Sequence, residues 1–343
     1  MSDSVNPYRG LPANAYWRSA VQDRHYFDLD ELCTPVRLQK QDHIATAGSC
    51  FAQHIGRHLR ESGAGYMDLE PRPAFLDPSD EKRFGFGIYS CRYGNIYTAR
   101  QLLQLAQEAL GQRVPSDVVW ARAGRWFDAL RPGVDPVGYE TTDQVLQLRA
   151  THLRAVATML RELDVFVFTL GLTEAWESAV DGTVYPTAAG TIVGSHDPLK
   201  YRFRNFRYPE ILSDLQTFWR LLKSVNPKAR MMLTVSPVPL NATASGEHVL
   251  VASSRSKAVL RAVAGDFAAD EPEVAYFPSY EIISSHPARG MFFEPDLRNV
   301  NDCGVRLVMK HFFRFFGDLQ APMQDSDDDT IICEEAELDR AAR

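Results

Sequence analysis

The chain alternates between two hydrophobic patterns, short continuous apolar runs and longer amphipathic stretches. The continuous runs are typical of strands buried on both faces, and they cover 43–47, 164–170, 230–235 and 274–277. The amphipathic stretches have the period of an α-helix, and they cover 50–61, 100–111, 142–162, 208–224 and 254–268. Alternation of this kind predicts one three-layer α/β domain, with a mostly parallel sheet covered by helices.

A last helix is predicted near the end of the chain, where Val305, Val308 and Phe312 repeat at helical spacing. Asn301 or Asp302 can cap its first turn, and Gly317 can end it. We therefore expect the α/β domain to cover 41–318. Residues 1–40 are predicted to be an extension packed on this core, and the acidic residues 319–343 a disordered tail.

Composition and charge narrow the function classes. The net charge of −7 argues against a nucleic-acid partner, which attracts basic surfaces. No apolar run approaches the roughly 18 residues of a membrane helix, and the first residues lack the basic and apolar segments of a secretory signal. Neither a phosphate-binding loop nor a dinucleotide fingerprint is present, so we expect no cofactor.

The five cysteines at 33, 50, 91, 303 and 333 have no C-x-x-C spacing, which favours reduced thiols and a cytoplasmic protein. His54 and His58 have the i, i+4 spacing of metal ligands, but no carboxylate with ligand spacing accompanies them. We interpret them as part of a solvated helix face and expect no metal site.

Candidate chemistry lies where the predicted strands end, because ligands of parallel α/β sheets bind at the carboxyl ends of the strands. Ser49 and Cys50 follow the first strand and begin a helix. A nucleophile on such a turn has backbone N–H groups beside it that can stabilise an oxyanion, and the helix dipole lowers a thiol pKa. The alternative is a helix cap that contains a buried cysteine.

Thr173 and Glu174 follow the second apolar run, in Gly171-Leu172-Thr173-Glu174. Thr173 can donate a hydrogen bond there and Glu174 can accept one, or Glu174 can serve only as a charge at a helix start. The basic and aromatic run at 200–207 can hold an anionic group of a sugar or carrier, or form a lid or edge segment with ordinary surface charge.

The segment Gly48-Ser49-Cys50-Phe51-Ala52 resembles the motif that gives the GSCFA-domain family its name. The resemblance continues through blocks in the same order over about 40–316, and these blocks lie at 90–98, 170–176, 234–240, 256–257 and 276–281. That family looks like a branch of the SGNH (GDSL-type) hydrolases. The resemblance therefore implies a flavodoxin-like fold and an esterase or acyl-transferring activity.

The resemblance also implies roles for single residues. When the SGNH motif Gly-Asp-Ser-Leu is placed on 48–51, Cys50 takes the position of the nucleophile and Ser49 that of the aspartate. A shift by one residue makes Ser49 the nucleophile instead. Thr173 takes the place of the oxyanion-hole asparagine, and Gly94, beside Asn95, is the glycine expected to donate a second N–H.

The Asp-x-x-His block of that superfamily falls on Asp296-Leu297-Arg298-Asn299. Asn299 stands at the histidine position, and an amide cannot act as a general base. His286, earlier in the same loop, is the candidate that remains, although a single loop histidine is also common as a surface residue.

Two functions follow from these residues. The first is an SGNH-like esterase or acyltransferase that acts on a small-molecule or glycan ester. The second is a binding module that keeps the fold without the catalytic histidine.

Overall fold

The computed structural model describes residues 6–33, 37–316, 331 and 334. A four-stranded parallel sheet lies at its centre, in the order β1-β4-β8-β9. Its strands are β1 (Ile44–Gly48), β4 (Val165–Leu170), β8 (Arg230–Val235) and β9 (Val274–Phe277). A parallel bridge from Ile44 to Tyr66 adds a single residue pair outside β1. When the segment at Tyr66 is counted as the second of five in chain order, their order across the sheet is 2-1-3-4-5, which is the flavodoxin-like order.

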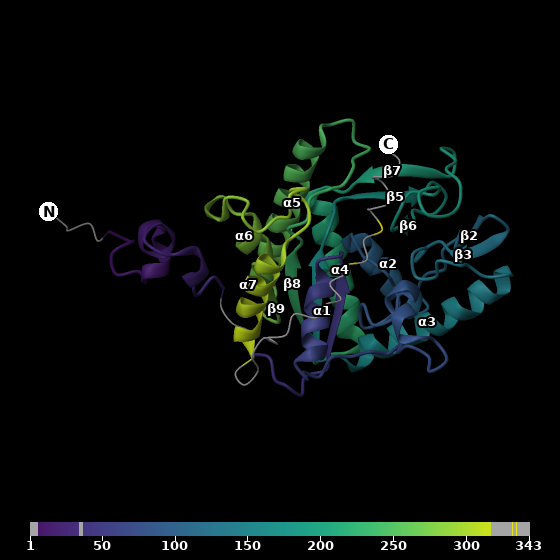
Figure 1. The fold of residues 1–343 in the computed structure, drawn as a ribbon, viewed down its shortest axis with the longest axis horizontal. Helices are drawn as coiled ribbons and strands as arrows, with labels where there is room; N and C mark the ends of the chain where they lie inside the picture. The colour runs from purple at the N-terminus through teal and green to yellow at the C-terminus, as the bar shows by residue number, and fades with distance from the viewer. Residues whose placement is uncertain (1–5, 34–36, 317–330, 332–333, 335–343) are drawn as a thin grey trace.

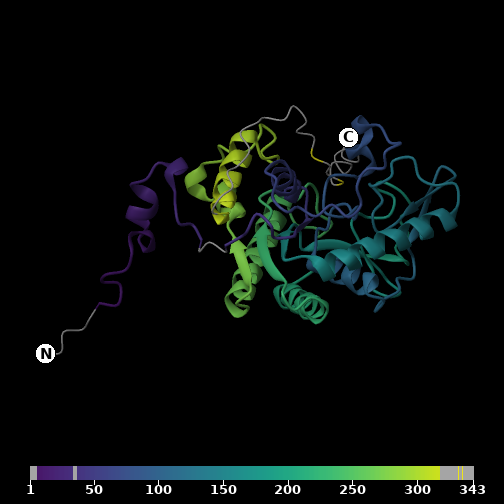
Figure 2. The same ribbon diagram turned by 90° about the horizontal axis from the view of Figure 1, so that it is seen from below.

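Helices cover both faces of the sheet, which confirms the predicted three-layer α/β architecture (Figures 1 and 2). One face carries α2 (Ala99–Ala109), α3 (Thr142–Glu162), α4 (Tyr208–Val225) and α5 (Val249–Asp270). The other carries α1 (Ala52–Glu61), α6 (Ser279–Ser284) and α7 (Asp302–Phe312).

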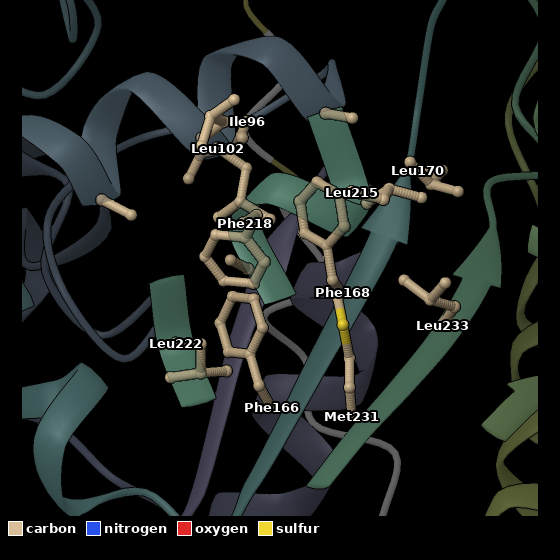
Figure 3. Close-up of a cluster of buried hydrophobic side chains, with 14 of the residues drawn as sticks. Ile96, Leu102, Phe166, Phe168, Leu170, Leu215, Phe218, Leu222, Met231 and Leu233 are labelled. Carbon is tan, nitrogen blue, oxygen red and sulfur yellow. The ribbon is translucent and has the colours of Figure 1, made fainter. Parts of the chain in front are cut away.

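The period of two in β4 explains why the sheet has two separate cores. Phe166 and Phe168 point to one face and pack near Phe218 of α4 (Figure 3), whereas Val165 and Val167 point to the other. All of these side chains are fully buried or nearly so. Burying one side chain of this size stabilises the fold by about 1.5–3 kcal/mol, so β4 holds the two helical layers together.

Within the described residues, five further strands lie outside the parallel sheet, and the hydrophobic pattern did not predict them. The hairpin β2 (Val119–Arg122) and β3 (Arg125–Asp128) is one group; β5 (Glu174–Ser178), β6 (Val184–Tyr185) and β7 (Tyr201–Asn205) form an antiparallel sheet in the order β6-β5-β7. The basic and aromatic run is thus an edge strand, in which buried Tyr201 and half-buried Phe203 alternate with exposed Arg202 and Arg204. Glu174, at the start of β5, lies on a strand and not at a helix start.

The N-terminal residues contact the core through a short segment. The Tyr26 hydroxyl donates to the carbonyl oxygen of Ile282 over 2.7 Å, and the Tyr26 ring lies 5.5 Å from that of Phe292. Residues 6–16 are exposed and extend away from the body of the molecule (Figure 1). The predicted tail at 319–343 lies outside the described residues, apart from half-buried Ile331 and buried Glu334.

Candidate functional site

The first strand ends in a turn that only glycine can make. Gly48 has φ +140°, and a β-carbon there would stand 2.5 Å from the carbonyl oxygen of Thr169 on the neighbouring strand. Because an L-residue rarely adopts this φ and no space exists for its side chain, Gly48 brings β1 and β4 into close contact where the chain leaves the sheet.

Ser49 and Cys50 occupy different positions on this turn. The Ser49 N–H donates to Thr169 O over 3.2 Å, so Ser49 still belongs to the sheet. The Cys50 carbonyl accepts from the N–H of Gln53 over 3.1 Å, which makes Cys50 part of the first turn that leads into α1. Their exposed fractions are 3% and 5%. The Ser49 Oγ is buried and makes no hydrogen bond within the described part of the chain, and such a group is rare in native proteins.

The segment before α2 lies against this turn. Ile96 donates its N–H to the carbonyl oxygen of Gly48 over 2.9 Å. The Asn95 Oδ1 accepts from the Tyr89 hydroxyl at 2.7 Å and from Gln53 Nε2 at 3.2 Å. Asn95 therefore ties the segment to α1. Gln53 was not among the predicted site residues, because its burial and its bond to Asn95 depend on segments that spacing along the chain does not bring together.

Gly94 has φ +69°, and a β-carbon there would lie 3.3 Å from a carboxylate oxygen of Glu334. The backbone of Gly94 thus borders an anionic group from the C-terminal segment. The oxyanion role expected of Gly94 remains a prediction.

The end of β4 completes the site. Gly171 and Leu172 donate their N–H groups to the carbonyl oxygen of Tyr97, over 3.1 and 2.9 Å. A β-carbon on Gly171 would stand 2.8 Å from the Cβ of Ser49, so these two segments touch. Lys257, buried in α5, donates through Nζ to the Gly171 carbonyl over 2.8 Å. Three segments far apart in sequence therefore converge at one edge of the sheet. The turn at Gly48 and the end of β4 were expected there because they follow strands, whereas the segment 94–97 does not follow a strand of this sheet.

Thr173 and Glu174 both have partners outside the turn. The Thr173 N–H and hydroxyl donate to the Ser256 Oγ, over 3.1 and 3.2 Å. The Glu174 carboxylate accepts from the Thr243 hydroxyl, with distances of 2.8 and 3.0 Å to its two oxygens. Burial raises the pKa of Glu174, against the hydrogen bond from Thr243 and the nearby charge of Arg255.

The loop before α7 holds Asp296 and Asn299 together. The Asp296 Oδ1 accepts from the backbone N–H groups of Arg298 and Asn299, each at 2.9 Å, and its Oδ2 accepts from the Asn299 side-chain amide at 2.5 Å. These bonds lower the pKa of Asp296, although partial burial opposes them. The hydrogen bonds of this pair are thus made within its own loop.

His286 lies in another part of the same connection. Its ring stacks on that of Trp17, with centroids 5.2 Å apart and planes 13° from parallel, and its side chain is exposed. Within the described residues, no hydrogen bond joins this imidazole to Ser49 or Cys50. The role of His286 as a base remains a prediction.

His54 and His58 lie on α1, one and two turns beyond Cys50. Both are 8% exposed, so the interpretation of a solvated helix face is wrong: packing of other segments covers this side of α1. The His58 Nδ1 donates to the His54 carbonyl over 2.8 Å when it carries the proton. Over the described residues, no three His, Cys, Asp or Glu side chains gather in a way that could hold a metal ion.

A second group of buried polar residues lies away from the turn. Arg149 and Arg131 both bind Asp128, at 2.9 and 2.7 Å, and the His152 Nδ1 lies 2.6 Å from a carboxylate oxygen of Glu70. Burial lowers the pKa of His152 to about 4. Burial would raise the pKa of Glu70, but the hydrogen bond from His152 and the charge of Arg131 have the larger combined effect and lower it to about 2. Near neutral pH a neutral imidazole therefore donates to a carboxylate, and these residues join α3 to the loops beside it.

The four cysteines in the described ranges, Cys33, Cys50, Cys91 and Cys303, are thiols. Burial raises the pKa of Cys33 to about 11 and raises that of Cys91 well above the ordinary value. In the same ranges, no helix combines the length and the apolar character needed to cross a bilayer.

A model of the GSCFA family matches residues 43–312, which include every strand of the parallel sheet, the turn at Gly48 and helix α7. No curated protein matches the chain. Since the family match spans most of the sequence, the chain belongs to the GSCFA family.

Proposed function

We propose that this protein is an esterase or acyltransferase of the SGNH type, and that Cys50 is its nucleophile. The observation that carries the proposal is the turn at Gly48, which brings two nucleophilic side chains to the point where 94–97 and Gly171 also meet. Ligands of parallel α/β sheets bind at this edge. The resemblance of the Gly48–Phe51 segment to the SGNH nucleophile motif supports the same reading.

The geometry of the turn favours Cys50 over Ser49. The backbone N–H of Ser49 already donates to the carbonyl oxygen of Thr169. The Ser49 side chain lies so close to Gly171 that no further carbon atom fits between them. Cys50 instead stands where the chain enters α1, and the N-terminal end of a helix stabilises a thiolate.

His54 is the proposed base. It is a buried imidazole in the first turn of α1, four residues after Cys50, which lies in the turn before the helix. We propose it in place of His286, whose exposed ring stacks on Trp17. His54 would take the proton of the thiol as sulfur bonds to the ester carbonyl carbon, and return that proton to the alcohol as the C–O bond breaks. Water or a second alcohol would then attack the thioester, which releases the acyl group as an acid or a new ester.

One observation favours a second function, that of a binding module. The Asp296–Asn299 pair repeats the spacing of the SGNH Asp–His pair, but it ends in an amide that is hydrogen-bonded back to its own loop. In that case the fold and its pocket would bind an ester without cleaving it.

Labelling of the two side chains separates these functions. Iodoacetamide reports an activated thiol and a fluorophosphonate reports an activated hydroxyl, and peptide mass mapping locates each adduct. We expect iodoacetamide at pH 7 to modify Cys50 at least tenfold faster than Cys33, whose high pKa makes it an internal control. We expect Cys50→Ala to abolish this adduct and Ser49→Ala to keep it. Fluorophosphonate labelling that Ser49→Ala removes would assign the role to Ser49. Labelling at neither residue above a denatured sample would favour the binding module.

A further inference from the structure

A pocket beside the candidate site has no role in the proposed acyl transfer. It has a volume of about 210 Å³ and lies between β5, β7 and the loop at 240–244. Leu172, next to Gly171, forms part of its wall. Gly171 contacts Ser49, and the next residue, Leu172, lines the pocket. The pocket is therefore adjacent to the nucleophilic turn.

Its wall carries two aromatic rings from paired strands. Trp176 of β5 is opposite Phe203 of β7, and their ring centroids are 5.9 Å apart at an angle of 65°. Both side chains are half-buried and line the pocket. Aromatic faces of this kind bind flat apolar surfaces, including the C–H face of a sugar ring.

A buried carboxylate gives the pocket its polar end. Glu174 is 9% exposed, and its carboxylate accepts the Thr243 hydroxyl. A carboxylate offers about four acceptor positions. The Thr243 hydroxyl, the backbone of Ala244 and, at 3.5 Å, the Asn205 amide take up to three of them, which leaves one for a ligand. The raised pKa of Glu174 reflects its removal from water. Ligand groups that donate hydrogen bonds would therefore be favoured here over groups that only accept them.

These features distinguish between ligand classes. An acyl chain would cover the Glu174 carboxylate without donating to it, which costs free energy. An ammonium group would be attracted by Glu174 and Glu247 and repelled by Arg255, and a fully alkylated nitrogen could not donate a hydrogen bond to the Glu174 carboxylate. A neutral sugar fits both conditions, because its hydroxyls donate to Glu174 while its C–H face packs on Trp176. The volume is below the roughly 300–1,000 Å³ of pockets for drug-sized ligands, which suits a single ring.

We infer that this pocket binds one pyranose ring of a neutral sugar. Its biological role rests on the proposed function: the sugar would be the alcohol part of the ester, held while its acyl group is at Cys50. Binding itself requires no catalysis, so the two proposals can be tested apart.

Saturation-transfer NMR on the Cys50→Ala variant tests the inference without turnover. The probes are a set of methyl hexopyranosides and methyl N-acetylglucosaminide, with hexanoate and tetramethylammonium as rivals. We expect at least one glycoside to bind and neither rival to displace it. Glu174→Gln should weaken this binding at least fivefold, and so should Trp176→Leu, a second variant that leaves the carboxylate in place and removes an aromatic face of the pocket. Phe75→Ala, at a side chain that is 91% exposed, is the control and should change nothing.

Each other outcome is decisive. Three results would overturn the inference. The first is displacement of the glycoside by hexanoate or tetramethylammonium. The second is no glycoside binding up to about 100 mM, which corresponds to about 1–2 kcal/mol of binding free energy, and the third is binding that neither pocket variant weakens. Glycoside binding in a protein that never forms an acyl-enzyme would overturn the proposed function and leave the sugar pocket standing. An acyl-enzyme without glycoside binding would do the reverse.

Discussion

A β-carbon on Gly171 would stand 2.8 Å from the Cβ of Ser49 and 3.2 Å from the carbonyl oxygen of Tyr97. The φ of Gly171 is outside the left-handed range, so steric contact alone requires glycine at this position. The close approach fixes the end of β4 against the nucleophilic turn.

We expect Gly171→Ala to lower the free energy of unfolding by about 1–3 kcal/mol, because an added methyl group in a packed site displaces its neighbours. Urea denaturation measures this change. Gly265→Ala is the matched control: Gly265 lies inside α5, and only the flexible Arg261 side chain is within 4 Å of the added carbon. Alanine should be neutral or stabilising in that helix. Equal stability of the two variants would contradict the close contact at Ser49.

Acid should destabilise the fold in two steps, because the buried groups beside α3 bind fewer protons when folded. The pKa of His152 is about 4 in the folded protein and 6.5 ordinarily, so its contribution is complete above pH 6.5 and is lost between 6.5 and 4. The pKa of Glu70 and that of Asp128 are both about 2, against 4.5 and 3.8 ordinarily, so their contributions are lost below pH 4.5.

Urea midpoints at intervals from pH 8 to pH 4 measure the first step. His152→Gln should remove about half of the slope between pH 6.5 and 4.5, since glutamine does not titrate, whereas burial also lowers the pKa of His311 to about 4 and this group still contributes. His286→Gln, at an exposed histidine, is the control and should keep the slope of the wild type. An unchanged slope in His152→Gln would show that other groups cause the first step.

The strands and helices of the central domain were largely predictable from local patterns. The predicted helix at 142–162 and the strands at 230–235 and 274–277 have the observed bounds. Their signals are local: α3 begins with a capping box between Thr141 and Gln144, and buried parallel strands are continuously apolar. The same rule placed Ser49 and Gly171 at one edge of the sheet.

The rest depends on contacts between distant segments. More than twenty residues of chain separate β5 from β7, its partner strand, and β6 has only two residues. These strands are too short to carry a long periodic hydrophobic signal. The hydrogen bonds from Thr173 to Ser256 and from Gln53 to Asn95 join different elements, and spacing along the chain does not reveal them. The burial of His54 has the same cause, since segments outside α1 cover it.

Asn301 should hold the loop that contains Asp296 and Asn299. Its Oδ1 accepts the Gly304 N–H at 3.0 Å as the cap of α7, and its Nδ2 donates to the carbonyl of Met291 at 3.0 Å. We expect Asn301→Ala to cost about 1–2 kcal/mol and to speed hydrogen exchange in 292–300.

Thr141→Ala, which removes the cap of α3, is the matched control for this effect. It should cost about 1 kcal/mol without changing exchange in 292–300. If hydrogen exchange in 292–300 has the same rate in both variants, Asn301 does not anchor this loop.

The proposed base makes a separate prediction. We expect His54→Gln to slow alkylation of Cys50 at pH 7 by about 10²-fold or more, because a positioned base contributes about 10²–10⁴-fold. His286→Gln and Asn299→Ala should leave the rate within about twofold. Stopped-flow alkylation under native conditions measures these rates, and near-UV circular dichroism checks the fold. A large loss in His286→Gln with none in His54→Gln would place the base in the loop before α7.

The central claim is that Cys50 carries the acyl group, and intact-protein mass spectrometry tests it most directly. The protein is mixed with p-nitrophenyl acetate and quenched in acid, and its intact mass is measured. Peptide mapping then locates the acetyl group. We predict one acetyl group on Cys50 in the wild type, retained in Ser49→Ala and absent from Cys50→Ala. An adduct that persists in Cys50→Ala, or acetylation no greater than in the denatured protein, would contradict the claim.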